Sequence, residues 1–263
     1  MSTRLDAGET RKRLVPLVAL ALVAIAWALA SPPIAQDPAY HRFADARTLF
    51  GIPRFWNVVS NVPFTLVGLY GLHACRVARL GRPEDRWPWL AVAIGSVFVG
   101  LGSGYYHLAP SDTTLFWDRL PMTLAFMGLF SVAIVERIHH RAGLFLLLPF
   151  VVLGALSVEV WRRGALAGVG DLRFYALVQF YPMLALPLVL LLFPSRYDRA
   201  WALWATLALY VAAKLFEGLD AQVYTLLGHA MSGHAIKHVL AAAAVGVAFH
   251  AVARRSPTAS VPP

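Results

Sequence analysis

Apolar positions along this chain gather into long stretches that short polar breaks separate. The stretches are about 17 to 22 residues long, the length that a helix needs to cross a hydrocarbon core of roughly 30 Å. Breakers such as Ser31-Pro32-Pro33 and Gly81-Arg82-Pro83 lie between them. We therefore predict an all-α fold, a polytopic membrane helical bundle, with eight helices at about 14–31, 56–75, 89–108, 118–136, 142–160, 172–193, 200–216 and 230–252.

Composition supports a single membrane domain. The 263 residues are 59% hydrophobic and 14% charged, too few polar groups to cover a soluble surface. The net charge of +9 comes from basic residues in short loops. Because these form no continuous stripe, they indicate membrane topology and no nucleic-acid partner. The lone Cys75 excludes an internal disulfide framework and a cysteine-based zinc cluster.

The distribution of Lys and Arg predicts the orientation. With a cytoplasmic N-terminus, the inside segments carry 14 basic residues and the outside loops carry six. This positive-inside bias places both termini in the cytoplasm. For a bacterial chain, which the alanine-rich style suggests, that means the inner membrane.

The two ends of the chain have their own expected roles. Residues 1–13 form a basic cytoplasmic segment, and 253–263 read as a disordered tail. Helix 14–31 follows basic residues and ends in Ala28-Leu29-Ala30, so it also resembles a secretory signal with its cleavage site. Its apolar run is long for a signal, which favours a retained helix.

Ionisable residues converge at the predicted outer ends of the helices. Such residues are costly in a membrane and are candidates for function. His107 ends the third helix, Asp118 opens the fourth, and His234 and His238 lie in the first turns of the eighth. The last two share one helix face because they are four residues apart. With His107 they can supply three zinc ligands and leave the fourth position to water, as in catalytic zinc sites.

Structural explanations compete with each of these roles. A histidine can be a hydrogen-bonded interfacial residue, Asp118 can be a helix N-cap, and Ser103, one turn before His107, can be a packing residue. His229 is a weaker candidate for supporting a ligand. Four further charged residues can form structural pairs or support the ligand histidines: Lys214, Glu217, Asp220 and Lys237.

Four motifs carry a family resemblance. They are Phe55-Trp56-Asn57-Val58-Val59-Ser60-Asn61-Val62-Pro63, Ser103-Gly104-Tyr105-Tyr106-His107, Asp118-Arg119-Leu120-Pro121-Met122 and His234-Ala235-Ile236-Lys237-His238. In this order and spacing, from about 55 to 245, the chain resembles the alkaline ceramidase family of the CREST superfamily of membrane hydrolases.

The resemblance implies a seven-helix zinc hydrolase core at 56–252, with 14–31 as an additional helix. It implies that His107, His234 and His238 bind Zn²⁺ near the non-cytoplasmic (periplasmic) face, that Asp118 is the acid/base and that Ser103 lies beside the metal. The substrate would be ceramide or a related N-acyl lipid, cleaved at its amide. Eukaryotic members bind calcium through acidic residues before the Phe-Trp-Asn motif, but this chain has Arg54 there, so calcium is not expected.

Two alternatives belong to other functional classes. The superfamily also includes the progestin and adipoQ receptors, so a zinc-containing receptor without turnover is the main rival. A transporter would be expected to show two halves related by a repeat, and the sequence shows none. The exact lipid and the oligomeric state do not follow from the sequence.

Overall fold

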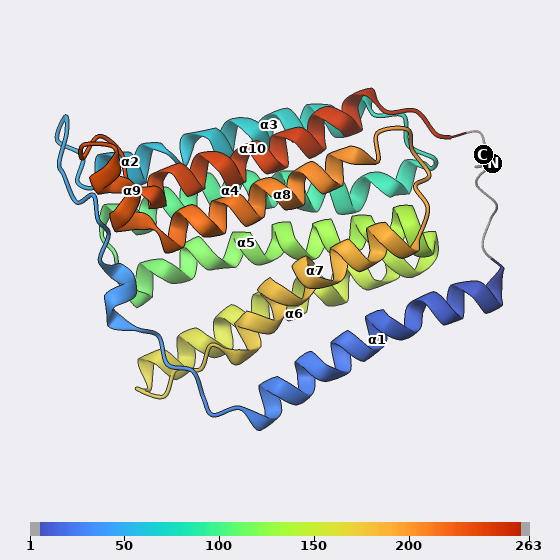
Figure 1. Ribbon diagram of the computed structural model, residues 1–263, viewed down its shortest axis with the longest axis horizontal. Helices are drawn as coiled ribbons and strands as arrows, with labels where there is room; N and C mark the ends of the chain where they lie inside the picture. Colours follow the sequence, from blue (N-terminus) through green and yellow to red (C-terminus); the bar gives the residue numbers. More distant parts are fainter. Residues whose placement is uncertain (1–5, 259–263) are drawn as a thin grey trace.

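The computed structural model describes residues 6–258, and these form a helical bundle (Figure 1). The long helices are α1 (Ala7–Ala30), α3 (Val62–Val77), α4 (Arg86–Leu108), α5 (Asp112–Ala133), α6 (His140–Leu166), α7 (Arg173–Leu192), α8 (Trp201–Gly218) and α10 (Gly233–Arg254). Shorter turns are α2 (Phe55–Val59), α9 (Asp220–Leu226), η1 (Pro38–His41), η2 (Pro83–Asp85) and the π-turn η3 (Ile134–Ile138). The predicted all-α class is confirmed.

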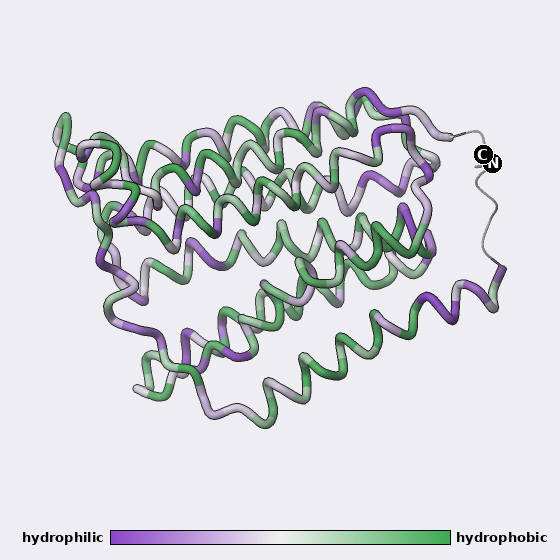
Figure 2. Tube along the Cα trace, viewed as in Figure 1, coloured by the Kyte–Doolittle hydropathy of each residue, from purple (hydrophilic) through white to green (hydrophobic). Residues whose placement is uncertain are grey.

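Each of the eight predicted stretches corresponds to a long helix. Among the described residues, seven helical segments are long and apolar enough to cross a membrane, and α8 with α9 forms an eighth candidate that bends by 82°. The chain is therefore an integral multi-pass membrane protein. Figure 2 shows the apolar colouring along the helices and the polar colouring toward their ends.

Three predicted boundaries are wrong by six or seven residues: α1 begins at Ala7, α6 ends at Leu166 and α5 begins at Asp112. The last of these matters for the site. We expected Asp118 to open the fourth helix, but α5 begins at Asp112. Ser111 is its N-cap: the Ser111 side chain accepts a hydrogen bond from the backbone N–H of Thr114, and the Thr114 side chain bonds the Ser111 backbone in return. Asp118 thus lies in the second turn of α5, and the N-cap explanation for it is excluded.

The helices that carry the candidate residues pack closely. α4 lies against α3 and α5, and α10 lies against α3 and α8. A Cβ atom at Gly102 would stand 2.0 Å from the carbonyl oxygen of Trp117, and one at Gly233 would stand 2.2 Å from that of Phe216. These two glycines let α4 approach α5, and α10 approach α8, beside the candidate site.

The first helix lies at the edge of the bundle. α1 packs chiefly on α7, and Leu17 is its one buried residue (Figure 1). Large side chains such as Leu22 and Leu29 are exposed, as expected of a helix that faces lipid. This agrees with a helix added to a seven-helix core, although the domain boundaries remain a prediction.

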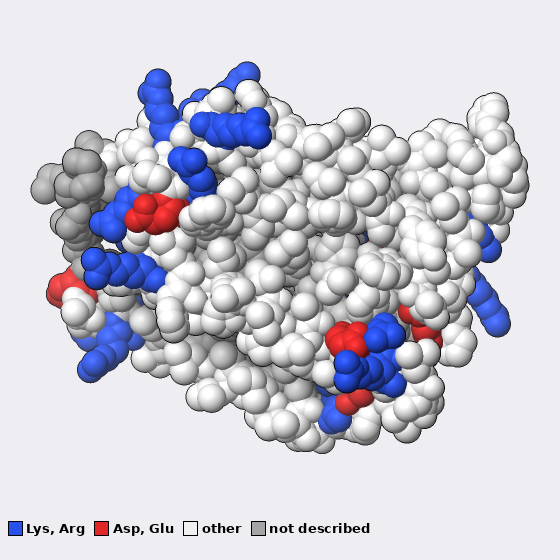
Figure 3. Space-filling view, turned by 180° about the vertical axis from the view of Figure 1, so that it is seen from behind, with Lys and Arg blue, Asp and Glu red and all other residues white. Residues whose placement is uncertain are grey.

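Charged side chains gather toward the two ends of the molecule. Figure 3 shows a broad belt without Lys, Arg, Asp or Glu between them, and Lys and Arg prevail at the end where both termini lie. Of the expected basic segment and tail, the structure describes residues 6–13 and 253–258. α1 begins at Ala7, Arg255 is buried, and Pro257 forms a bridge with Tyr197. Positions 1–5 and 259–263 lie outside the described residues.

Candidate metal centre and active site

Three histidines from two distant helices meet in the bundle. His107 comes from the last turn of α4, and His234 and His238 come from the first two turns of α10. All three are buried, and one ring nitrogen from each lies within 4.8 Å of the others. Among the described residues, these three form the one cluster of metal-binding side chains.

The start of α10 is held in place by its neighbours. Ser232 caps the helix by accepting a hydrogen bond from the Ala235 N–H. The Asp220 carboxylate accepts the backbone N–H of His234 at 2.7 Å through one oxygen and that of Ala44 at 2.9 Å through the other. Asp220 therefore fixes the helix that carries two histidines, but it bonds the backbone of His234 and not its ring.

The ring geometry fits a tetrahedral metal. The Nε2 atoms of His107 and His234 face each other at 3.3 Å. Zinc bound tetrahedrally by imidazole nitrogens at 2.0–2.1 Å separates two of them by about 3.3 Å. The Nδ1 atom of His107 is buried without a partner among the described residues. Two facing ring nitrogens in a buried site are costly unless something binds both.

His238 is oriented by the motif at the start of α3. Its Nδ1 lies 2.8 Å from the Ser60 hydroxyl, and that hydroxyl can donate onward to the Asn57 carbonyl at 3.4 Å. When the hydroxyl donates to Asn57, Nδ1 carries the proton and the Nε2 lone pair is free; the Asn61 amide nitrogen also lies 3.3 Å from Nδ1. Ser60 therefore holds His238 in the tautomer that a metal requires.

The segment between α1 and α2 covers the histidines. The Phe43 ring lies 4.6 Å from the His107 ring and 4.5 Å from the His234 ring. Nearby, Arg47 bonds the buried Asp45 through two nitrogens and the Ala230 carbonyl at 2.8 Å. Burial acts to raise the pKa of the Asp45 carboxyl, but the hydrogen bonds from Arg47 outweigh it and hold this pKa below its ordinary value. The ion pair thus ties the covering segment to the loop before α10.

A large apolar cavity begins beside the metal-binding cluster. Its volume is about 500 Å³, within the range of small-molecule sites, and its wall includes His238, Ser103 and Asp118. Ser103 and Asp118 line the cavity together. Further along, side chains such as Phe64, Val99 and Leu186 make the wall apolar. The structure therefore places all five predicted site residues in one region.

Lys237 and Lys214 share Glu217 at the polar end of this cavity. Lys237 Nζ lies 2.5 Å from Glu217 Oε1, and Lys214 bonds the other carboxylate oxygen. The three side chains line the cavity as a paired group and bond no histidine ring among the described contacts. The structural explanation for these residues is the one that the geometry favours.

The remaining histidines lie outside the cluster. His41 is near it, but its ring bonds the Tyr106 hydroxyl at 2.9 Å and Asp112 at 3.1 Å. His229 stacks against Tyr224 in the loop before α10, so it does not support a ligand ring directly. Sequence reasoning did not single out Ser60 or Phe43, and only the motif that contains Ser60 gave a signal for it.

Comparison with known proteins agrees with this geometry. A search of curated proteins gives no match. A family model described as Ceramidase matches residues 51–190, just over half of the chain. This range includes Ser103, His107 and Asp118, and the fold brings His234 and His238 to them from beyond it. The chain belongs to the ceramidase family.

Proposed function

We propose that this protein is a zinc-dependent amidohydrolase of the membrane that cleaves the N-acyl amide of ceramide or a related lipid. The products would be a free fatty acid and an amine. One observation carries the proposal: the buried histidine cluster opens onto an apolar cavity at the point where Asp118 and Ser103 stand. Membership of the ceramidase family supports amide hydrolysis as the reaction class.

His107, His234 and His238 would hold the metal. A zinc ion held there would lower the pKa of a bound water to about 7 and would polarise a substrate carbonyl. The Ser60 hydroxyl keeps His238 in the tautomer that can bind it. Phe43 packs against two of the rings, one of them edge to face, and would limit access of bulk water from the covering segment.

Asp118 would act as general acid and base. Its carboxylate lines the cavity next to the cluster, so it can take a proton from the attacking water and return it to the leaving amine. Ser103 lines the same part of the cavity and can donate a hydrogen bond to the developing oxyanion. The apolar wall would take the acyl chain, since each buried CH₂ contributes about 0.8 kcal/mol to binding.

The decisive test compares the wild type with Asp118→Asn. Asparagine keeps the size of the side chain but removes the base, so hydrolysis should fall about 10²-fold or more while zinc content stays unchanged. Fatty acid release is measured from ceramides and other N-acyl lipids, in detergent or bilayers, with equal zinc per chain. A receptor without turnover, the alternative of the progestin and adipoQ receptor type, predicts no release by either protein. Equal rates in both would remove Asp118 from the mechanism.

We further propose that both termini are cytoplasmic and that the metal centre lies near the opposite, periplasmic face. The prevalence of Lys and Arg at the end that holds the termini supports this orientation (Figure 3). A single cysteine in place of Thr113, in a Cys75→Ala background, should react with an impermeant label from the periplasmic side. Reaction from the cytoplasmic side alone would reverse the orientation.

A further inference from the structure

Arg119 is a buried cation in the wall of the large cavity. It follows Asp118 on α5 and is 5% exposed. Its guanidinium lies 4.3 Å from the Trp161 ring centre and 4.8 Å from that of Tyr175. Aromatic faces stabilise a desolvated cation, but they do not neutralise its charge.

Among the described residues, no carboxylate lies within ion-pair distance of Arg119. Its hydrogen-bond partner is the neutral amide of Gln36, whose Oε1 lies 2.6 Å from one terminal nitrogen. The other terminal nitrogen is buried without a partner, and so is the indole N–H of the adjacent Trp161. Two buried donors at one place therefore lack an acceptor, which is rare unless a ligand supplies it.

The charge of the cavity points the same way. Its wall holds the cations Arg119, Lys214 and Lys237 and the carboxylates Asp118 and Glu217, which leaves one net positive charge. The two lysines already share Glu217. Of the three cations in the cavity wall, Arg119 is the one that has no carboxylate within ion-pair distance among the described residues.

We propose that Arg119 binds an acidic group on the amine portion of the substrate, so that the preferred substrate is an anionic N-acyl lipid. This inference rests on the proposed function. A free guanidinium nitrogen beside a free indole N–H matches a carboxylate, phosphate or sulfonate, which accept paired hydrogen bonds. The carboxylate of the released fatty acid could accept the same hydrogen bonds. That carboxylate forms at the metal, however, whereas Gln36 and the aromatic rings fix the position of Arg119 in the cavity wall.

The turnover test uses two lipids with one acyl chain, N-palmitoylglycine with a carboxylate and N-palmitoylethanolamine with a hydroxyl. The wild type should favour the acidic lipid by about 10-fold or more in kcat/KM, the usual effect of a hydrogen-bonded ion pair. In Arg119→Gln this ratio should fall toward one. Arg162→Gln is the matched control, because Arg162 pairs with Glu159 away from the cavity, and it should keep the wild-type ratio.

A second variant guards against misfolding of the first. Gln36→Glu places a carboxylate at the position that already bonds Arg119, so it should neutralise the guanidinium without removing it. The acidic preference should then disappear while the unfolding temperature stays equal or rises. A wild-type ratio near or below one, or an unchanged ratio in both variants, would overturn the proposal. The proposal would also be overturned if the two variants were less inhibited by free fatty acid than the wild type but kept its substrate ratio. Arg119 would then bind the carboxylate of the product.

A binding measurement separates this inference from the proposed function. Hexadecyl sulfonate cannot be hydrolysed, and it should raise the unfolding temperature of the wild type more than hexadecanol does. Gln36→Glu and Arg119→Gln should remove the difference. If the protein shows no turnover but the sulfonate still stabilises it more than the alcohol does, the hydrolase function is contradicted and the anion site stands. If the two ligands stabilise the wild type equally, the anion site is contradicted.

Discussion

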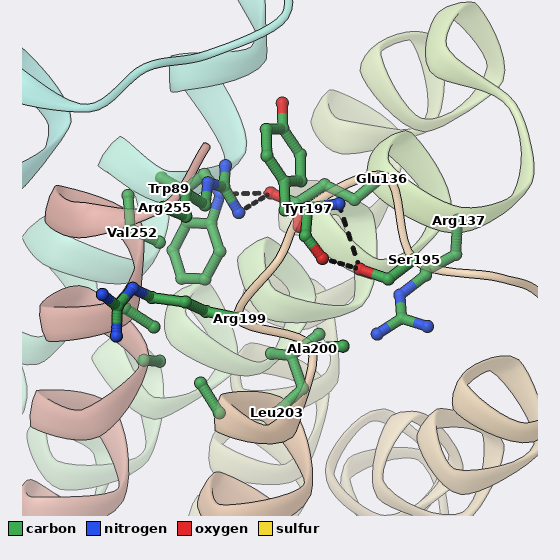
Figure 4. A pocket seen from close by; sticks show the side chains of 13 residues that line it. Trp89, Glu136, Arg137, Ser195, Tyr197, Arg199, Ala200, Leu203, Val252 and Arg255 are labelled. Carbon is green, nitrogen blue, oxygen red and sulfur yellow. Dashed lines mark hydrogen bonds and ion pairs between the residues drawn. The ribbon is translucent and has the colours of Figure 1, made fainter. Parts of the chain in front are cut away.

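The two ends of the bundle both bury polar side chains, but they partner them differently. At the histidine end, defined by His107, His234 and His238, ring nitrogens face one another beside a cavity of about 500 Å³. At the arginine end, defined by Glu136 and Arg255, the cavity has a volume of about 20 Å³, room for a single water molecule (Figure 4).

At the arginine end the buried carboxylate and the buried guanidinium pair with each other. Glu136 accepts bonds from Arg255 and from the Trp89 indole, both at 2.7 Å, and Arg255 lies 3.7 Å from the centre of the Tyr197 ring (Figure 4). This group ties the end of α10 to η3 and α4. The comparison teaches that burial alone does not mark an active site. Unmatched donors alone do not mark one either, because Nε and Nη2 of Arg255 are also buried without a partner among the described residues. At the histidine end such groups lie next to a cavity large enough for a ligand.

The largest effect is expected from removing two ligands at the histidine end. His234→Ala with His238→Ala leaves one histidine, so metal content should fall from about one zinc per chain to none and hydrolysis should be lost. Metal analysis of purified protein and fatty acid release measure these effects. His73→Ala is the control, because this exposed histidine of α3 lies outside the cluster. Full zinc retention in the double variant would refute the metal site.

The next largest effect is expected at the arginine end, and on stability alone. Glu136→Gln leaves Arg255 buried without a carboxylate, so unfolding in detergent should become easier by about 3–5 kcal/mol while the folded fraction keeps its zinc. Glu159→Gln is the control, because its pairs with Arg162 and Arg163 are partly exposed and should contribute much less to stability. Equal destabilisation by both changes would contradict the contrast between buried and exposed pairs.

The difference between the two ends also explains what the sequence could and could not predict. Helix spans follow from local apolar runs, and the pairing of His234 with His238 follows from a spacing of four. Their meeting with His107 depended on motif order, since no local pattern says which helices pack together. The boundary at Asp118 was missed because the Ser111 cap is a local signal inside a polar stretch. The partners of Arg119 and Arg255 come from distant segments, so composition alone could not reveal which cation is balanced.

A smaller effect is expected from Ser60, which touches a ligand and not the metal. Ser60→Ala removes the acceptor for the His238 Nδ1–H, so zinc affinity should fall about 10- to 100-fold with the fold retained. Competition with a chelator of known affinity measures the change. Ser131→Ala is the matched control, since this buried serine bonds the Gly143 carbonyl and contacts no ligand histidine. Equal affinities in the Ser60 variant and the wild type would show that the contact does not orient His238.

The smallest effect is expected at a partly exposed ion pair near the histidine end, formed by Asp171 and Arg173. We call this pair the anchor of α1, because it bonds the end of that helix and the chain that follows it. Asp171 accepts hydrogen bonds from the Arg173 side chain at 2.8 Å and from the Ile34 N–H at 3.2 Å, and Arg173 also bonds the Ala28 carbonyl. The Arg173 side chain and the backbone bonds outweigh burial and lower the pKa of the Asp171 carboxyl from 3.8 to about 2. The anchor holds Trp27 and Ile34 in the cavity wall.

A carboxyl with a lowered pKa stabilises the fold when it is ionised, so its contribution is complete above about pH 5 and is lost as the pH falls toward 2. After allowance for screening of this partly exposed pair, Asp171→Asn should cost about 1 kcal/mol at pH 6. At pH 2.5 the gap between wild type and variant should shrink to about a third of that value. The carboxyl of the unfolded chain is then protonated, so keeping it ionised in the folded state contributes much less to stability. Denaturant unfolding in detergent at the two pH values measures both gaps. In an Arg173→Gln background, Asp171→Asn should change the unfolding free energy little at either pH. An undiminished change in that background, or one that grows on acidification in the wild-type background, would show that the ion pair does not stabilise the anchor.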